Sequence, residues 1–166
     1  LKALYSHALS KPGMVGISIG TRADCVEEGL FEYLAELSKD VEVWIEFGIQ
    51  STYNSVLDGI NRAESFEQIA MRIKEAKSYG LNVCGHMIFG LPGESVEMMK
   101  EGMKRVYELD IDSIKFHPCY VTQNTALAAQ FNSGKFKPLN EKEYVALLAD
   151  VLKEMPENIS IQRFSA

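Results

Sequence analysis

Five polar residues occupy alternate positions inside three apolar stretches of this sequence. They are Glu46 and Gln50 in VEVWIEFGIQ, His86 in NVCGHMIFG, and Lys115 and His117 in SIKFHPCYV. A histidine exchanges protons near neutral pH, so His86 and His117 are candidates for an acid or a base. The amide of Gln50 can hydrogen-bond the hydroxyl or carboxylate groups of a ligand. The pattern allows either acid–base chemistry or ligand binding, and it assigns no catalytic residue.

Two turns at the ends of apolar stretches carry groups suited to anions. In IGTRAD, Arg22 comes just past the stretch, where its planar guanidinium can bind a carboxylate or a phosphate. In IFGLPGES, Gly90 and Gly93 let the backbone approach a ligand closely. Ser95 then begins a helix whose N–H groups can meet an anion. Both turns are therefore candidate parts of a binding site.

Each of these residues also has a purely structural interpretation. His86 can be a hydrogen-bonded core histidine, and Gln50 can cap the loop that follows it. Glu46 and Lys115 can form an ion pair across neighbouring strands. Arg22 can pair with a nearby aspartate, and the glycine turn can be a plain connection. What favours a functional site is that several strands bring polar groups to the same face.

The apolar stretches alternate with helical patterns, which predicts parallel strands joined by helices. The expected strands are 14–21, 41–50, 82–90 and 113–121, with a further strand at 159–164, and the expected helices are 25–40, 65–80, 95–110 and 141–155. Gly80 is the expected stop of the second helix, and Ser95 is the expected N-cap of the third.

The two sides of each expected strand differ in polarity. The apolar positions are Val15, Ile17, Ile19, Val43, Ile45, Phe47, Val83, Met87, Phe89, Ile114 and Phe116. The alternate positions are Ser18, Gly20, Glu46, Gly48, Gln50, Cys84, His86, Lys115 and His117. Helices on both faces of a flat sheet would bury these charges, and an unpaired buried charge costs several kcal/mol. We therefore predict an α/β fold that forms part of a β/α barrel, because a closed eight-fold barrel needs roughly 250 residues.

Composition narrows the class of protein. The chain is 46% hydrophobic and has a net charge of −6, so a broad nucleic-acid footprint is not expected, although a local basic groove remains compatible. No stretch is long and apolar enough for a membrane span, and no secretory signal is recognised. Three widely spaced cysteines favour a reducing compartment, which predicts a cytoplasmic protein without disulfides, and they offer no metal site.

Several motifs occur in an order that resembles a known family. They are IGTRAD, WIEFGIQS followed by INRAESF, HMIFGLPGES, and KFHPCYVTQNTALA. Together they resemble the radical S-adenosylmethionine (SAM) superfamily, in the subgroup of oxygen-independent coproporphyrinogen III oxidase and the catalytic subunit of Elongator. Within that subgroup the sequence is most similar to bacterial proteins of poorly defined function. The resemblance covers essentially all 166 residues.

The resemblance implies a fold and a cofactor site. The fold would be an incomplete (β/α)6 barrel of which these strands are the third to the sixth, with SAM across their carboxyl ends. The residues implied to contact SAM are Gln50, His86, Gly90 and Gly93, with Arg22 on its methionine carboxylate. Gly20 departs from the family, because the coproporphyrinogen enzyme has an acidic ribose ligand there. On the substrate side, the expected residues are Glu46, Lys115 and His117.

One family motif is missing from this sequence. The C-x-x-x-C-x-x-C loop of the superfamily binds a [4Fe–4S] cluster through three thiolates, and no such triad occurs here. The resemblance therefore implies that residues 1–166 are the C-terminal portion of a radical SAM core domain, with the cluster ligands upstream. Such a portion is expected to be inactive by itself. The whole enzyme, an oxidoreductase or transferase, would need an external electron donor.

The substrate and the rival functions stay open at this point. The Elongator resemblance suggests RNA as the substrate, and the coproporphyrinogen resemblance suggests a tetrapyrrole. A dimer through the open barrel edge is also expected, because large apolar openings rarely stay uncovered. The main alternative is a β/α module that binds a nucleotide or phosphate without redox chemistry. A hydrolase or lyase using His86 or His117, and a folded scaffold without activity, are the others.

Overall fold

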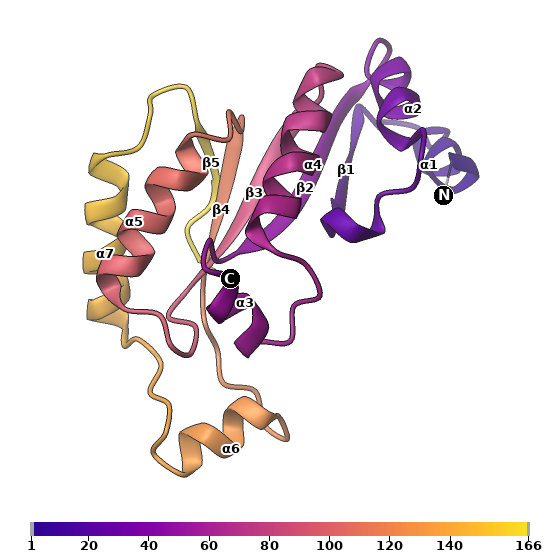
Figure 1. Cartoon of the computed structure of the whole chain (residues 1–166). Helices are drawn as coiled ribbons and strands as arrows, with labels where there is room; N and C mark the ends of the chain where they lie inside the picture. Colours follow the sequence, from indigo (N-terminus) through magenta and orange to yellow (C-terminus); the bar gives the residue numbers. More distant parts are fainter. Residues whose placement is uncertain (1, 166) are drawn as a thin grey trace.

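Residues 2–165 form five parallel strands with helices between them in a computed structural model (Figure 1). The strand order in the sheet follows the chain: β1 (Gly16–Thr21), β2 (Glu42–Gln50), β3 (Asn82–Phe89), β4 (Ser113–Pro118) and β5 (Ser160–Arg163). Every pair of neighbouring strands is parallel. This arrangement confirms the predicted arc of β/α units, including the strand near the C-terminus.

The helices that contribute residues to the core pack against one face of the sheet. The helices of the described chain are α1 (Lys2–Leu9), the short 3-10 helix η1 (Ala23–Cys25), α2 (Leu30–Leu37), α3 (Asn54–Gly59), α4 (Phe66–Ser78), α5 (Val96–Tyr107), α6 (Ala126–Asn132) and α7 (Glu141–Lys153). In Figure 1, α4 lies in front of β2 and β3, while α5 and α7 pack side by side near β4 and β5. None of the helices within residues 2–165 combines the length and apolar character that a membrane crossing requires.

Local sequence signals fix the ends of the main helices. The Ser65 hydroxyl accepts a hydrogen bond from the Gln68 N–H, and the Gln68 side chain accepts one from the Ser65 N–H, which forms a capping box for α4. Gly80 has a φ of +74° just after this helix, as its predicted role as a stop requires. Ser95 caps α5 by accepting from the Met98 N–H at 3.2 Å, which is also as predicted.

The core lies between the helices and the apolar face of the sheet. Ile45 and Phe47 of β2, Val83 of β3 and Phe116 of β4 are fully buried there, together with Leu34 of α2. Side chains on the opposite face stay partly or fully accessible along much of β1, β3 and β4. The two faces therefore divide as the alternation predicted, with helices outside and a polar inner face.

Several predicted boundaries are wrong. The first strand begins at Gly16 instead of residue 14, and Val15, predicted to face the core, is 82% exposed. The helix predicted over 25–40 spans only Leu30–Leu37, because Gly29 adopts a left-handed conformation with a φ of +71° just before it. The strand predicted over 113–121 ends at Pro118.

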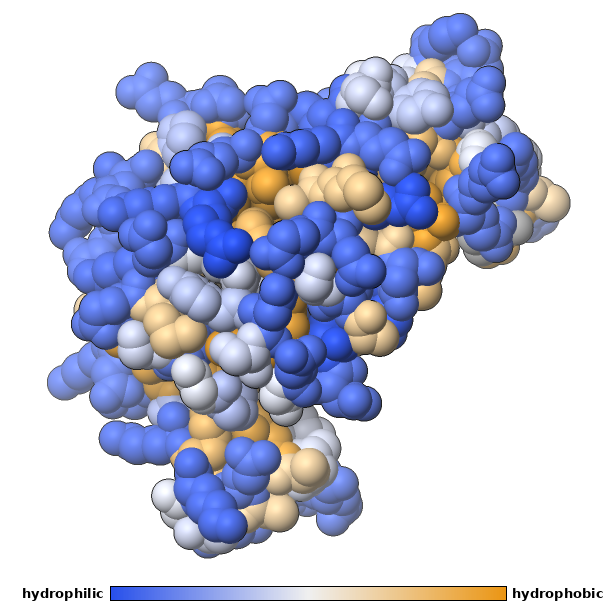
Figure 2. Space-filling model, in the orientation of Figure 1, coloured by the Kyte–Doolittle hydropathy of each residue, from blue (hydrophilic) through white to orange (hydrophobic). Residues whose placement is uncertain are grey.

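Two short helices escaped the sequence analysis. Helix α3 follows β2 and buries only Val56 and Leu57. Helix α6 buries none of its residues and stands apart from the body of the molecule, joined to it by two extended segments (Figure 1). Figure 2 shows hydrophobic colouring near this end of the molecule, bordered by hydrophilic residues. Neither helix has the long amphipathic pattern that identifies a core helix.

Candidate functional site

One carboxylate joins four strands on the inner face. Glu46 on β2 accepts hydrogen bonds from the Ser18 hydroxyl on β1, from His86 Nε2 on β3 at 2.6 Å, and from Lys115 Nζ on β4 at 2.5 Å. Its side chain is only 10% exposed. The sequence analysis placed Glu46 and Lys115 on neighbouring strands, and this was wrong, because β3 lies between β2 and β4. The ion pair itself exists, and His86 lies with it.

The charges in this cluster follow from its contacts. Burial acts to raise the pKa of Glu46, but the bonds from Lys115, Ser18 and His86 together outweigh it and hold the pKa at about 2. Burial lowers the pKa of His86 below its usual value, against the opposing effect of Glu46. His86 is therefore neutral at pH 7. Since the ionised Glu46 can only accept, His86 donates from Nε2, and its Nδ1 is left as an acceptor.

A hollow of about 500 Å³ opens beside this cluster at the carboxyl ends of the first strands. We call it the inner hollow, and it is lined by Gly20, Thr21, Arg22, Cys25, Glu46, Gly48, Gln50, Arg62 and His86. Three of the residues expected to bind a cofactor, Arg22, Gln50 and His86, thus line one space. A Cβ atom on Gly20 would meet nothing within 4 Å. Gly20 therefore leaves room where a side chain would narrow the hollow.

A bulge in β2 turns Gln50 into this hollow. The pairing with β3 shifts between Gly48 and Gln50, and Gln50 has a φ of +67°, which is rare for a residue other than glycine. Ile49 stays fully buried in the core as a result. The Gln50 amide lies directly over Gly48, where a Cβ atom would come within 2.5 Å of its Nε2. Such backbone strain persists where surrounding structure enforces it, often at functional sites.

A buried ion pair holds the bulge in place. Arg62 donates from Nη2 to the Gly48 carbonyl at 2.7 Å and pairs with Glu64 at 2.6 Å. The Glu64 side chain is 1% exposed and also accepts from the Asp24 N–H at 3.0 Å. This pair ties the bulge to the segment that carries Arg22. Arg62 and Glu64 belong to the INRAESF motif but were not predicted as site residues, although two opposite charges so close together were a usable signal.

Arg22 is already engaged by a neighbour. Its Nε donates to Asp24 Oδ1 at 2.8 Å, and its Nη2 binds the other carboxylate oxygen of Asp24. The structure therefore contains the ion pair that the sequence offered as the structural interpretation. Both side chains are about two-fifths exposed, so the pair is open to solvent. Binding of a ligand carboxylate by Arg22 stays a prediction.

The two turn glycines lie outside the lining of the inner hollow. Gly90 and Gly93 have φ values of +84° and +83°, so both need the conformational freedom of glycine. The Gly90 N–H donates to the Met99 sulfur at 3.0 Å, and a Cβ atom on Gly90 would come within 3.0 Å of Leu139. Space around Gly93 is open. Their contact with a cofactor stays a prediction.

A second, smaller hollow continues the polar face toward β4. It holds about 170 Å³ and is lined by Gln50, His86, Ile88, Lys115, Phe116, His117 and Arg163. Gln50 and His86 line both hollows, so the residues expected on the cofactor side adjoin those expected on the substrate side. Arg163 on β5 was not predicted as a site residue. Its position in the terminal strand IQRF, at the edge of the sheet, was the only signal.

The residues described here do not fit an iron–sulfur cluster. Within residues 2–165, no group of three or more histidine, cysteine or acidic side chains could hold a metal ion. The three cysteines are unpaired: Cys25 is exposed, Cys84 is buried and Cys119 is partly buried. Burial raises the pKa of Cys84 to about 11, which keeps it a thiol instead of the thiolate that cluster iron requires.

Fold and site together define a class of protein: part of a β/α barrel whose polar inner face opens at the carboxyl ends of its strands, where barrel enzymes bind their ligands. Comparison with known families identifies it further. The family described as the Radical SAM superfamily matches residues 2–106, and the Radical_SAM C-terminal domain matches residues 111–166. The chain belongs to the radical SAM superfamily.

Similar proteins agree with this assignment. An uncharacterised protein of Methanocaldococcus jannaschii, MJ0486, is 36% identical over 99% of this chain and 52% of its own length. The tRNA uridine(34) acetyltransferase of Methanocaldococcus infernus is 30% identical over 93% of this chain and 29% of its own. The chain spans about half the length of the curated relatives it matches most fully.

Solved structures confirm the partial barrel. Archaeal Elp3 from Methanocaldococcus infernus superposes with a TM-score of 0.80 and 30% identity, over 89% of this chain and 35% of its own. Coproporphyrinogen III oxidase (HemN) from Escherichia coli, described as a radical SAM enzyme, gives a TM-score of 0.61 and 24% identity, over 83% and 31%. The second likeness is evidence for the fold alone.

Proposed function

We propose that this chain is the SAM- and substrate-binding part of a radical SAM enzyme, which cleaves SAM reductively at a [4Fe–4S] cluster and abstracts hydrogen from a substrate. Membership of the superfamily supports this proposal. The observation that carries it is that Arg22, Gln50 and His86 line one hollow at the carboxyl ends of the strands. When bound and reduced, SAM supplies a carbon radical that removes hydrogen.

The residues of the inner hollow fit SAM by their chemistry. The Gln50 amide offers both a donor and an acceptor to the hydroxyl groups of a ribose. The neutral His86 ring offers Nδ1 as an acceptor, because Glu46 occupies its other nitrogen. Arg22 would exchange its exposed Asp24 partner for the SAM carboxylate, since exposed ion pairs of this kind are weak. Gly20 leaves the space for the bound molecule.

We propose that the cluster is bound by residues outside this chain. Residues 2–165 contain no suitable group of ligands, and the relatives are about twice as long. We therefore propose that the cluster-binding loop lies upstream of Leu1 in a longer protein, and that the 166 residues alone do not cleave SAM. An external electron donor would reduce the cluster. The oxidoreductase or transferase outcome depends on the substrate.

The first experiment reads the coding DNA upstream of the Leu1 codon and measures SAM binding by equilibrium dialysis. A cysteine triad upstream, with SAM bound by the cluster-loaded longer protein, supports the proposal. Gln50→Ala should weaken SAM binding about tenfold, the cost of one or two lost hydrogen bonds, while Gln162→Ala on exposed β5 should not. Binding of ATP and inorganic phosphate with no preference for SAM would instead support the nucleotide- or phosphate-binding module.

The substrate and the assembly are further proposals. The similarity to a tRNA uridine(34) acetyltransferase favours RNA as the substrate over a tetrapyrrole, because the coproporphyrinogen enzyme shares only the fold. We also propose dimerisation through β1, an edge strand with a neighbour on one side only. Met14 and Val15 beside it are 47% and 82% exposed. Sedimentation velocity should give a dimer that Val15→Lys converts to a monomer; a wild-type monomer would refute this.

A further inference from the structure

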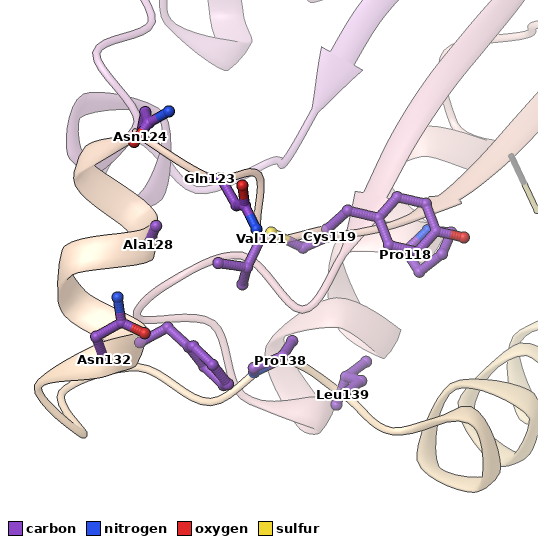
Figure 3. Close-up of a pocket in the computed structure, with 11 residues that line it drawn as sticks. Pro118, Cys119, Val121, Gln123, Asn124, Ala128, Asn132, Pro138 and Leu139 are labelled. Carbon is purple, nitrogen blue, oxygen red and sulfur yellow. The ribbon is translucent and has the colours of Figure 1, made fainter.

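A cavity of about 660 Å³ lies at the carboxyl end of β4 and shares no lining residue with the two hollows already described (Figure 3). We call it the carboxamide pocket. Its walls are the loop after β4, helix α6, and the segment that returns toward α7. In Figure 3, Val121 and Gln123 form one side, Asn132 lies on α6, and Pro138 and Leu139 lie on the returning segment. The volume is in the range of small-molecule sites.

The lining of the pocket combines amides with apolar groups. Its side chains include three carboxamides, Gln123, Asn124 and Asn132, and apolar surfaces from Val121, Phe131 and Leu139. None of the lining residues carries a formal charge at pH 7. Each carboxamide presents a donor and an acceptor side by side. The pocket therefore suits an uncharged, flat group that has both donors and acceptors along its edge, as a nucleobase has.

The pocket gives a structural role to helix α6, which does not contribute to the core. Helix α6 buries none of its residues, so it adds little to the stability of the fold. Its Ala128, Phe131 and Asn132 nevertheless line the pocket. Asn124, in the turn before the helix, has a φ of +62°, a conformation that asparagine tolerates in turns. The segment is thus shaped around the cavity.

The pocket is connected to the polar inner face. The His117 ring meets the Tyr120 ring edge to face, with 5.5 Å between their centroids. His117 lines the smaller hollow and Tyr120 lines the pocket. A group held in the pocket therefore lies next to the residues expected on the substrate side.

The charge of the surrounding segment favours one source of such a group. Residues 116–140 contain two lysines, Lys135 and Lys137, and no aspartate or glutamate, although the whole chain has a net charge of −6. Lys135 and Lys137 are exposed on the segment that leads to Pro138. An uncharged pocket with positive charges beside it suits a nucleobase that is attached to a phosphate backbone. It suits a free heterocycle less well, because a free heterocycle has no phosphates for the lysines to bind.

We propose that the carboxamide pocket binds an unstacked nucleobase of a single-stranded RNA, and that it is the substrate subsite of the enzyme proposed above. The carboxamides read the edge of the base, the apolar side chains contact its faces, and the exposed Lys135 and Lys137 bind neighbouring phosphates. The assignment of the pocket as a substrate subsite rests on the proposed radical SAM function. The proposed binding of RNA by the pocket does not depend on that function, because it requires neither SAM nor a cluster.

The test measures RNA binding by the 166-residue chain without cofactor. The probe is a fluorescein-labelled single-stranded RNA of about twelve nucleotides, read by fluorescence anisotropy. Uridine, cytidine, adenosine and guanosine, read by saturation-transfer NMR, test free nucleosides, and heparin tests a polyanion without bases. The RNA should bind, heparin should compete poorly, and Asn132→Leu and Gln123→Met should each weaken binding about tenfold. Lys135→Gln should reduce the dependence of binding on salt.

Gln130→Met is the matched control, because Gln130 is an exposed carboxamide of α6 outside the pocket lining. It should leave RNA binding unchanged. Equal loss in Gln130→Met and Asn132→Leu, full competition by heparin, or binding of free nucleosides but not RNA would each overturn the proposal. Far-UV circular dichroism should match the wild type in all variants. If RNA binds as expected but the cluster-loaded longer protein fails to cleave SAM, the proposed function fails and the pocket assignment stands.

Discussion

Replacing Glu46 by glutamine tests whether the inner face depends on one carboxylate. The change keeps the shape of the side chain but removes the charge that faces Lys115 Nζ at 2.5 Å. The Lys115 side chain is 15% exposed, so it would be left nearly buried without its partner. Breaking a buried pair in this way usually destabilises a protein by about 3–5 kcal/mol. We expect Glu46→Gln to lower the free energy of unfolding toward the lower end of that range.

The pKa of Glu46 gives an independent magnitude. A pKa of about 2 in the folded chain, against about 4.3 for an unfolded glutamate, corresponds to about 3 kcal/mol of stability at neutral pH. Because the folded pKa is the lower one, this contribution is present above about pH 4.3 and disappears as the pH falls toward 2. The stability difference between wild type and Glu46→Gln should therefore be about 3 kcal/mol at pH 7 and shrink steadily below pH 4.3.

Urea unfolding at a series of pH values measures this difference. The chain has a single tryptophan, Trp44, on the same strand, and its fluorescence reports the transition. Glu36→Gln is the control, because Glu36 pairs with Lys39 on a surface where its side chain is 73% exposed; its effect should stay within about 0.5 kcal/mol. A loss below about 1 kcal/mol in Glu46→Gln at pH 7, or a loss that does not change with pH, would refute the reasoning.

Three further perturbations follow from the structure. Burial raises the pKa of Glu94 to about 7, so ionisation of its carboxyl destabilises the fold as the pH rises. Urea unfolding should show that Glu94→Gln stabilises the chain by about 3 kcal/mol at pH 8 and hardly at pH 4. A Cβ atom on Gly102 would lie 2.7 Å from Thr52 Oγ1, so Gly102→Ala should lower the melting temperature. In a Thr52→Ala background this clash is absent, so the same change should raise the melting temperature, because alanine favours the helix more than glycine does. Ser65→Ala removes the cap of α4 and should cost about 1 kcal/mol of unfolding free energy; an unchanged urea midpoint would contradict that role.

Alternation along the strands was enough to predict which residues share the inner face. Side chains two apart point to the same side, so Glu46, His86 and Lys115 could be assigned to one surface from sequence. Alternation carries no information about which strands are neighbours, because the order of strands depends on the connections between them. The sequence analysis therefore misplaced Glu46 and Lys115 as neighbours, although they meet across β3.

The periodicity of apolar residues in the sequence did not predict the irregular parts of the backbone. The bulge at Gly48 and Gln50 is fixed by Arg62 and Glu64, which are more than ten residues further along the chain. Helix α6 has no side that faces the core, so its sequence lacks the periodic apolar pattern from which a helix is predicted. Both features surround ligand-sized spaces, where local rules of folding are most often overridden by the site.

Because the charges on the inner face balance one another, this face can keep its arrangement when no ligand is bound. Glu46 pairs with Lys115, and burial keeps His86 neutral, so this cluster carries no uncompensated buried charge at pH 7. An empty site of this kind need not collapse or rearrange, and preorganised groups lower the cost of binding. The same balance predicts that ligands are selected by hydrogen bonds from Gln50 and His86 instead of by net charge. If the inner hollow binds SAM as proposed, loss of Glu46 should weaken that binding by misplacing His86, although Glu46 is not itself expected to contact SAM.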